Sequence, residues 1–149
     1  MALLILGLLI FTAIHLFPAF QSRRALLIER LGAPKYNGIF SVISLASFTL
    51  IVIGKVNAPF IEIWQPPQML GVLTKLLMLP AMVLLVAAYF PSNFKRKIRH
   101  PMLIAVKVWA IAHLLINGDL ASMVLFGSFL AFAVLSMISA NKRDEWHKP

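Results

Sequence analysis

The 149-residue sequence contains no cysteine and only five acidic residues. The absence of cysteine excludes disulfide bonds, thiolate-bound iron–sulfur clusters, covalent c-type haem attachment and cysteine nucleophiles. Any metal ion would therefore need histidine or oxygen ligands. Common catalytic motifs are missing as well, because the chain has no G-x-S-x-G elbow, no H-E-x-x-H pair and no glycine-rich phosphate loop.

Charged side chains of either sign are scarce, at 13% of the chain, whereas hydrophobic residues reach 60% and the mean hydropathy is +0.88. A soluble domain needs far less apolar sequence than this. We therefore predict an all-α fold, a polytopic transmembrane helical bundle of about five spans, as a single domain over residues 1–149 with the lipid bilayer as its partner. Nucleic acid is not expected as a partner despite the net charge of +9, because the basic residues stand in short runs between apolar segments.

Five apolar runs along the chain have the length and composition of membrane-crossing helices. They predict helices over residues 2–20, 38–56, 69–90, 101–117 and 120–140. The segment 57–68 contains three prolines and Trp64, a combination that favours a partly ordered loop at the membrane interface. Gly118 and Asp119 form a very short turn before the last helix, which Asp119 is expected to cap.

The basic residues are distributed unequally between the two sides of this predicted bundle. Of the fourteen, four lie in the polar stretch 21–36, four between residues 95 and 99, and three after residue 140, whereas Lys55 alone lies in a predicted outer loop. Basic residues accumulate in cytoplasmic loops of membrane proteins. This asymmetry predicts an N-terminus outside the cell and a cytoplasmic C-terminus.

Two histidines, His15 and His113, lie well inside predicted helices. In one interpretation each donates a hydrogen bond to a neighbouring carbonyl or hydroxyl and holds two helices together. In the other, the pair supplies the axial ligands of a b-type haem held between helices, because neutral imidazole is a common iron ligand. A rise of 1.5 Å per residue would place the two Cα levels roughly 10 Å apart along the membrane normal, a difference that helix tilt partly absorbs. The residues leave both interpretations open.

The predicted fourth helix carries two polar stripes. His100 and Lys107 share one face, and His113 shares another with Trp109 and Asn117. A lysine at the centre of a membrane helix costs about 2.5 to 3.5 kcal/mol on insertion scales, so Lys107 needs an explanation. Either its ammonium group extends to the headgroups, or it meets an anionic group such as a carboxylate, phosphate or haem propionate together with Arg99. Our candidate cofactor-binding residues are Arg99, His100, Lys107 and Asn117, and our candidate metal ligands are His15 and His113.

The sequence resembles the NnrU family over nearly the whole chain, and three stretches carry the resemblance. They are Ile10 to Pro18, Leu79 to Tyr89, and the long run from Arg99 to Ser122 that continues from Leu125 to Phe129. The resemblance implies a small protein of the bacterial inner (plasma) membrane, linked to denitrification and nitric oxide metabolism. The family is in turn similar to zeta-carotene isomerase, a haem b enzyme with histidine ligation. By that similarity His15 and His113 are the positions that match haem ligands.

Several functions stay open at this point. A haem-based redox or nitric-oxide-handling factor would require bound haem b. Arg99, His100 and Pro101 also resemble a run in membrane methyltransferases of the isoprenylcysteine carboxyl methyltransferase type, so a methyltransferase-like enzyme acting on a lipid or isoprenoid is an alternative. The similarity to zeta-carotene isomerase adds an isomerase-like enzyme to this alternative. The next acid after His100 is Asp119, at the opposite membrane face, which places methyl transfer below haem binding. A non-catalytic assembly factor for a denitrification reductase is the third candidate.

Overall fold

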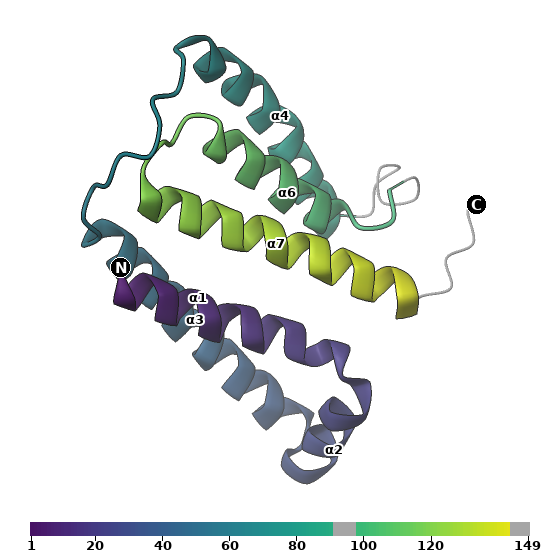
Figure 1. Ribbon diagram of the computed structural model, residues 1–149. Helices are drawn as coiled ribbons and strands as arrows, with labels where there is room; N and C mark the ends of the chain where they lie inside the picture. The colour runs from purple at the N-terminus through teal and green to yellow at the C-terminus, as the bar shows by residue number, and fades with distance from the viewer. Residues whose placement is uncertain (91–97, 144–149) are drawn as a thin grey trace. The chain divides into compact units, whose positions relative to one another are not determined.

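The computed structural model describes residues 1–90 and 98–143, and within them the chain is helical with one isolated β-bridge (Figure 1). The elements are α1 (Ala2–Leu16), the 3-10 helix η1 (Phe17–Ala19), α2 (Gln21–Leu31), α3 (Ala33–Val56), α4 (Met69–Tyr89), α6 (Pro101–Leu114) and α7 (Leu120–Arg143). The predicted all-α fold is therefore confirmed. Lys95, Arg96, Lys97 and the tail after Arg143, which entered the topology prediction, lie outside the described residues.

Four of the described helical segments are long and apolar enough to cross a membrane. They are Ala2–Ala19, Ala33–Val56, Met69–Tyr89 and Leu120–Lys142. The fifth apolar helix, Pro101–Leu114, has 14 residues and is about 21 Å long, shorter than a ~30 Å hydrocarbon core. This set agrees with a polytopic membrane protein of about five spans, one of them short.

The chain divides into two compact units, Met1–Pro59 and Phe60–Pro149. In the first unit α1 packs closely on α3 through glycines. A Cβ atom added to Gly7 would lie 2.8 Å from the backbone nitrogen of Ile51, and one added to Gly54 would overlap the backbone of Leu4. Leu4 and Ile51 are buried at this contact. Small residues that let two backbones approach are the usual way in which membrane helices associate.

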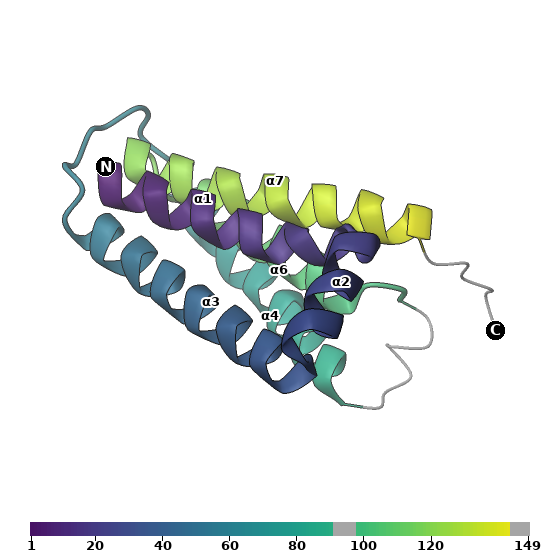
Figure 2. The ribbon, with the colours of Figure 1, turned by 90° about the horizontal axis from the view of Figure 1, so that it is seen from below.

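The polar stretch 21–36, to which we assigned charge but no helix, contains the amphipathic helix α2 and the start of α3. Gly32 separates the two with a φ of 80°, a left-handed conformation that glycine adopts without steric cost. Pro34 follows in the first turn of α3, where proline is favoured. Figures 1 and 2 show α2 at the end of the α1–α3 pair away from the N-terminus.

In the second unit α6 lies between its two neighbours and packs against both α4 and α7. The contact uses alanines, and Ala105, Ala110 and Ala112 are almost completely buried. The hydroxyl of Thr74 on α4 donates a 3.0 Å hydrogen bond to the carbonyl oxygen of Ala112. Close backbone approach and a buried interhelical hydrogen bond together hold α6 in place.

The segment before α4, predicted as a partly ordered loop, pairs with the turn between α6 and α7. Glu62 and Asp119 form an isolated antiparallel bridge. The amide of Ile63 donates a hydrogen bond to the carbonyl oxygen of Gly118 at 2.8 Å. The amide of Leu120 donates one to the carbonyl oxygen of Ile61, also at 2.8 Å. These bonds satisfy backbone groups that would otherwise be exposed at the ends of two apolar helices.

Candidate functional site

His113 lies near the end of α6, and its ring orientation is determined by a bond within the helix. Its Nδ1 atom is 2.9 Å from the carbonyl oxygen of Trp109. Because a carbonyl only accepts, Nδ1 must carry the proton and donate it. In the neutral imidazole Nε2 then holds the lone pair, and it has no hydrogen-bond partner within residues 1–90 and 98–143. Metal-ligating histidines are normally held in this way, with the second ring nitrogen bonded to a carbonyl or carboxylate.

Aromatic rings from α6 and α7 surround the imidazole of His113. The ring of Phe126 stacks on it at a centroid distance of 4.6 Å, and Trp109 lies 5.1 Å away. Trp109 in turn makes edge contacts with Phe126 at 5.1 Å and with Phe129 at 5.5 Å. This aromatic cluster restricts the χ angles of His113 and excludes water from one side of its ring.

The turn beside His113 is polar but internally bonded. The Asn117 side-chain amide donates to the carbonyl oxygen of His113 at 2.8 Å. Asp119, 6% exposed, accepts the amide of Ser122 at 3.0 Å, which confirms its predicted role as a cap of α7. The structure thus places Asn117 next to His113, as the sequence predicted, and gives its amide a backbone acceptor.

His15 on α1, in the first unit, has the same local arrangement. Its Nδ1 donates to the carbonyl oxygen of Phe11 at 2.8 Å, and the two rings stack at 3.9 Å. Phe40 from α3 contacts the imidazole edge-on at 5.3 Å, and the Ser44 hydroxyl lies 3.4 Å from Nε2. Both intramembrane histidines therefore present Nε2 away from their own helix backbone.

Lys107 lies in the middle of α6 and contacts α7. Its Nζ atom is 3.1 Å from the sulfur of Met137, and Lys107 is half-buried. A thioether is a weak acceptor, so this contact does little to offset the loss of water around an ammonium group. No carboxylate pairs with Lys107 in the part of the chain that the structure describes.

Arg99 and His100 join the start of α6 to the end of α7. The Nε2 atom of His100 lies 3.1 Å from the side-chain oxygen of Asn141, and an Arg99 guanidinium nitrogen lies 3.5 Å from the Asn141 carbonyl oxygen. Along α6 these residues are separated from His113 by about 20 Å. The predicted cofactor-binding residues therefore fall into two groups at opposite ends of α6, with Lys107 between them.

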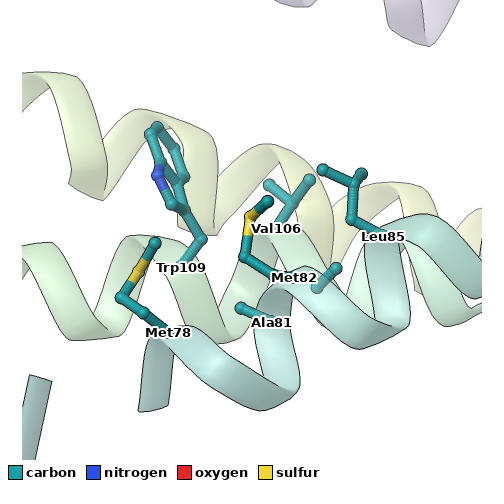
Figure 3. A pocket seen from close by; sticks show the side chains of 7 residues that line it. Met78, Ala81, Met82, Leu85, Val106 and Trp109 are labelled. Atoms are coloured by element: carbon teal, nitrogen blue, oxygen red, sulfur yellow. The ribbon is translucent and has the colours of Figure 1, made fainter. Parts of the chain in front are cut away.

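An apolar cavity of about 210 Å³ lies between α4 and α6. Figure 3 shows Met78 and Met82 projecting from α4 and Val106 and Trp109 from α6 around it. From the sequence Met78 and Met82 are expected to fill a core, because a methionine that lines a cavity has the same local pattern as one that fills a core. Trp109 connects this cavity to the aromatic cluster at His113.

The described residues hold no group of three or more histidine, cysteine or acidic side chains that could bind a metal ion. Comparison with known proteins gave no match among curated proteins and none among solved structures. A family model described as NnrU protein matches residues 3–149, nearly the whole chain. The chain therefore belongs to the NnrU family.

Proposed function

We propose that this protein binds haem b in the membrane, that His113 and His15 are the candidate residues that would hold its iron, and that the protein serves nitric oxide metabolism or denitrification. The observation that carries the proposal is the arrangement shared by the two histidines. Each lies in an apolar helix and uses Nδ1 to donate to its own helix backbone, at 2.9 Å in His113 and 2.8 Å in His15. Nε2 is then the ligating atom, as in histidine-bound haem.

The surrounding side chains fit a haem ligand better than a simple metal site. Flat aromatic rings flank both imidazoles, and an imidazole Nε2 is a nitrogen donor of the kind that haem iron takes. Lys107 offers an ammonium group whose present acceptor is a thioether, so a propionate carboxylate would be a stronger partner. Bound haem would supply one-electron redox chemistry or a site for nitric oxide, and the chain would orient the iron ligands and exclude water.

The cellular setting is part of the proposal. The family resemblance implies the bacterial inner membrane, and the basic asymmetry favours an N-terminus outside and a cytoplasmic C-terminus. Methyl transfer at Arg99 and His100 has less support, because both side chains contact Asn141 on α7. A denitrification reductase or its assembly machinery is the candidate protein partner.

The test is the absorption spectrum of the full-length protein purified from haem-replete cells. We expect a Soret band, a pyridine haemochrome of b type, and loss or shift of the band in His15→Ala and His113→Ala. Lys75→Met is the control, because Lys75 is exposed on α4, and it should keep the spectrum. Colourless wild-type protein would overturn haem binding, and co-purification of a reductase with such protein would support the assembly-factor alternative.

A further inference from the structure

A second apolar cavity, of about 190 Å³, lies within the first unit, where α2 meets α1 and α3. Its lining is almost entirely hydrocarbon and aromatic: Ile14, Phe17, Leu27, Leu31, Tyr36, Ile39, Phe40 and Ile43. The walls come from α1, η1, α2 and α3. A cavity of this kind at the end of two membrane-spanning helices can accept an acyl chain from the adjoining leaflet.

The α2 helix brings arginines to the edge of this cavity. Leu27 and Leu31 line the cavity from one face of α2, and Arg23 and Arg24 precede Leu27 by four and three residues, which places them on the same face. The guanidinium of Arg24 lies 6.0 Å from the ring centroid of Tyr36, which is itself a lining residue. The exposed guanidinium groups of Arg23 and Arg24 therefore lie at the edge of the apolar cavity.

Tyr36 adds a polar group to the wall. It is 8% exposed, and its hydroxyl is buried without a hydrogen-bond partner among the residues that the structure describes. A buried hydroxyl normally finds a partner, so an unpaired one next to a cavity indicates a missing acceptor. An ester or phosphate oxygen of a lipid is such an acceptor.

The charge balance selects the type of lipid. Residues 21–36 contain Arg23, Arg24, Arg30 and Lys35 against the single acid Glu29. Arginine is the side chain best suited to phosphate, through paired N–H donors. A zwitterionic headgroup would bring its own cation to this surface, whereas an anionic headgroup would not.

We propose that the α1–α2–α3 corner is a binding site for an anionic glycerophospholipid, with one acyl chain in the cavity and the headgroup phosphate on Arg23 and Arg24. This site lies within the first unit and shares Phe40 with the surroundings of His15, whereas Arg23, Arg24 and the Tyr36 hydroxyl take no part in the haem proposal. It would anchor α2 at the membrane surface and hold the inner end of the α1–α3 pair.

Native mass spectrometry of the full-length protein in detergent tests this site, with phosphatidylglycerol and phosphatidylcholine of identical acyl chains as probes. We expect the first phosphatidylglycerol to bind at least about fivefold more tightly than phosphatidylcholine, since each basic residue near an anionic headgroup contributes about that factor. Arg24→Gln should lower the ratio of the phosphatidylglycerol affinity to the phosphatidylcholine affinity about fivefold, and Arg24→Lys should retain most of this ratio. Equal affinity for the two lipids in the wild type would overturn the proposal.

Two further variants separate a site from general charge attraction. Lys142→Gln removes one exposed cation from α7 and should leave the preference unchanged. Leu27→Trp fills the cavity while keeping both arginines, and it should weaken the first binding event for either lipid. If Lys142→Gln lowers the preference as much as Arg24→Gln does, or if Leu27→Trp has no effect, the cavity is not the site.

Discussion

Gly118 lies directly against Trp64: a Cβ atom added to this glycine would overlap the carbonyl oxygen of Trp64. The contact holds the segment before α4 against the turn that connects α6 to α7, beside the aromatic cluster at His113. The backbone amides of Ile63 and Leu120 donate hydrogen bonds on either side of this contact. The segment before α4 and the turn therefore cannot move apart without breaking these bonds. The absence of a side chain at residue 118 is therefore a structural requirement.

The first prediction is that Gly118→Ala destabilises the second unit. Overpacking of a tight contact typically costs about 1 to 3 kcal/mol, and here the clashing atom is a backbone oxygen that cannot rotate away. The thermal unfolding midpoint in detergent should fall. Gly127→Ala is the control, because nothing lies within 4 Å of a Cβ added there and alanine favours a helix by up to about 1 kcal/mol. Equal midpoints for the two variants would contradict the contact.

A second prediction concerns the α1–α3 pair. Gly54→Ala should separate the two helices, because the added methyl group would meet the backbone of Leu4. Gly38→Ala on the same helix meets nothing within 4 Å and should be neutral or slightly stabilising. Cross-linking between one cysteine placed on α1 and one on α3 of this cysteine-free chain measures the separation. Unchanged cross-linking yield in Gly54→Ala would show that the glycine is not needed for close packing.

Much of the fold follows from local patterns in the sequence. The predicted helix over residues 69–90 is α4, Met69–Tyr89, because its boundaries are marked by a change from polar to apolar residues. The second predicted helix starts five residues too late, since Pro34 is favourable in the first turn and Gly32 ends the previous helix. The α2 helix was missed because its charges conceal an apolar face of Leu27 and Leu31. The fourth helix ends at Leu114, three residues early, where the turn pairs with the segment before α4.

The same distinction applies to the candidate site, where contacts within one helix are predictable from the sequence and contacts between helices are not. Two of its hydrogen bonds join residues only three or four positions apart, so the spacing in the sequence predicts them. They are the bond from the Ser122 amide to Asp119 and the bond from Nδ1 of His113 to the Trp109 carbonyl. The stacking of Phe126 on His113 and the approach of Lys107 to Met137 join different helices, and no pattern along one helix predicts them. The division into two units is likewise a property of interhelical packing, which one sequence does not reveal.

The third prediction tests whether the short α6 crosses the membrane. If α4, α6 and α7 all span, reporters fused after Asn57 and after Pro149 will lie on opposite sides, with the C-terminal reporter in the cytoplasm. If the 14-residue α6 does not cross, the two reporters will lie on the same side. We expect opposite sides, because buried alanines and the Thr74 bond hold α6 between two full-length helices. A phosphatase and a fluorescent-protein reporter at each position give complementary signals.

The last prediction concerns the half-buried ammonium of Lys107, whose acceptor is the sulfur of Met137 at 3.1 Å. Lys107→Met removes an insertion penalty of about 3 kcal/mol, so the variant should insert at least as well as the wild type. If Lys107 meets a propionate, the same change leaves a desolvated carboxylate without its partner, at a cost on the order of 3 to 5 kcal/mol. We therefore expect haem content per protein to fall sharply while expression is unchanged.

Two further variants decide between this role and simple extension to the headgroups. Lys75→Met is the matched control, because Lys75 is exposed on α4 and its ammonium can reach the membrane surface; its haem content should equal that of the wild type. Lys107→Arg keeps the charge but replaces a compact ammonium with a planar fork, which an interior pocket tolerates less well than the headgroup region does. We expect intermediate haem content in Lys107→Arg. Unaltered haem retention in both Lys107 variants would show that the ammonium only extends to the surface.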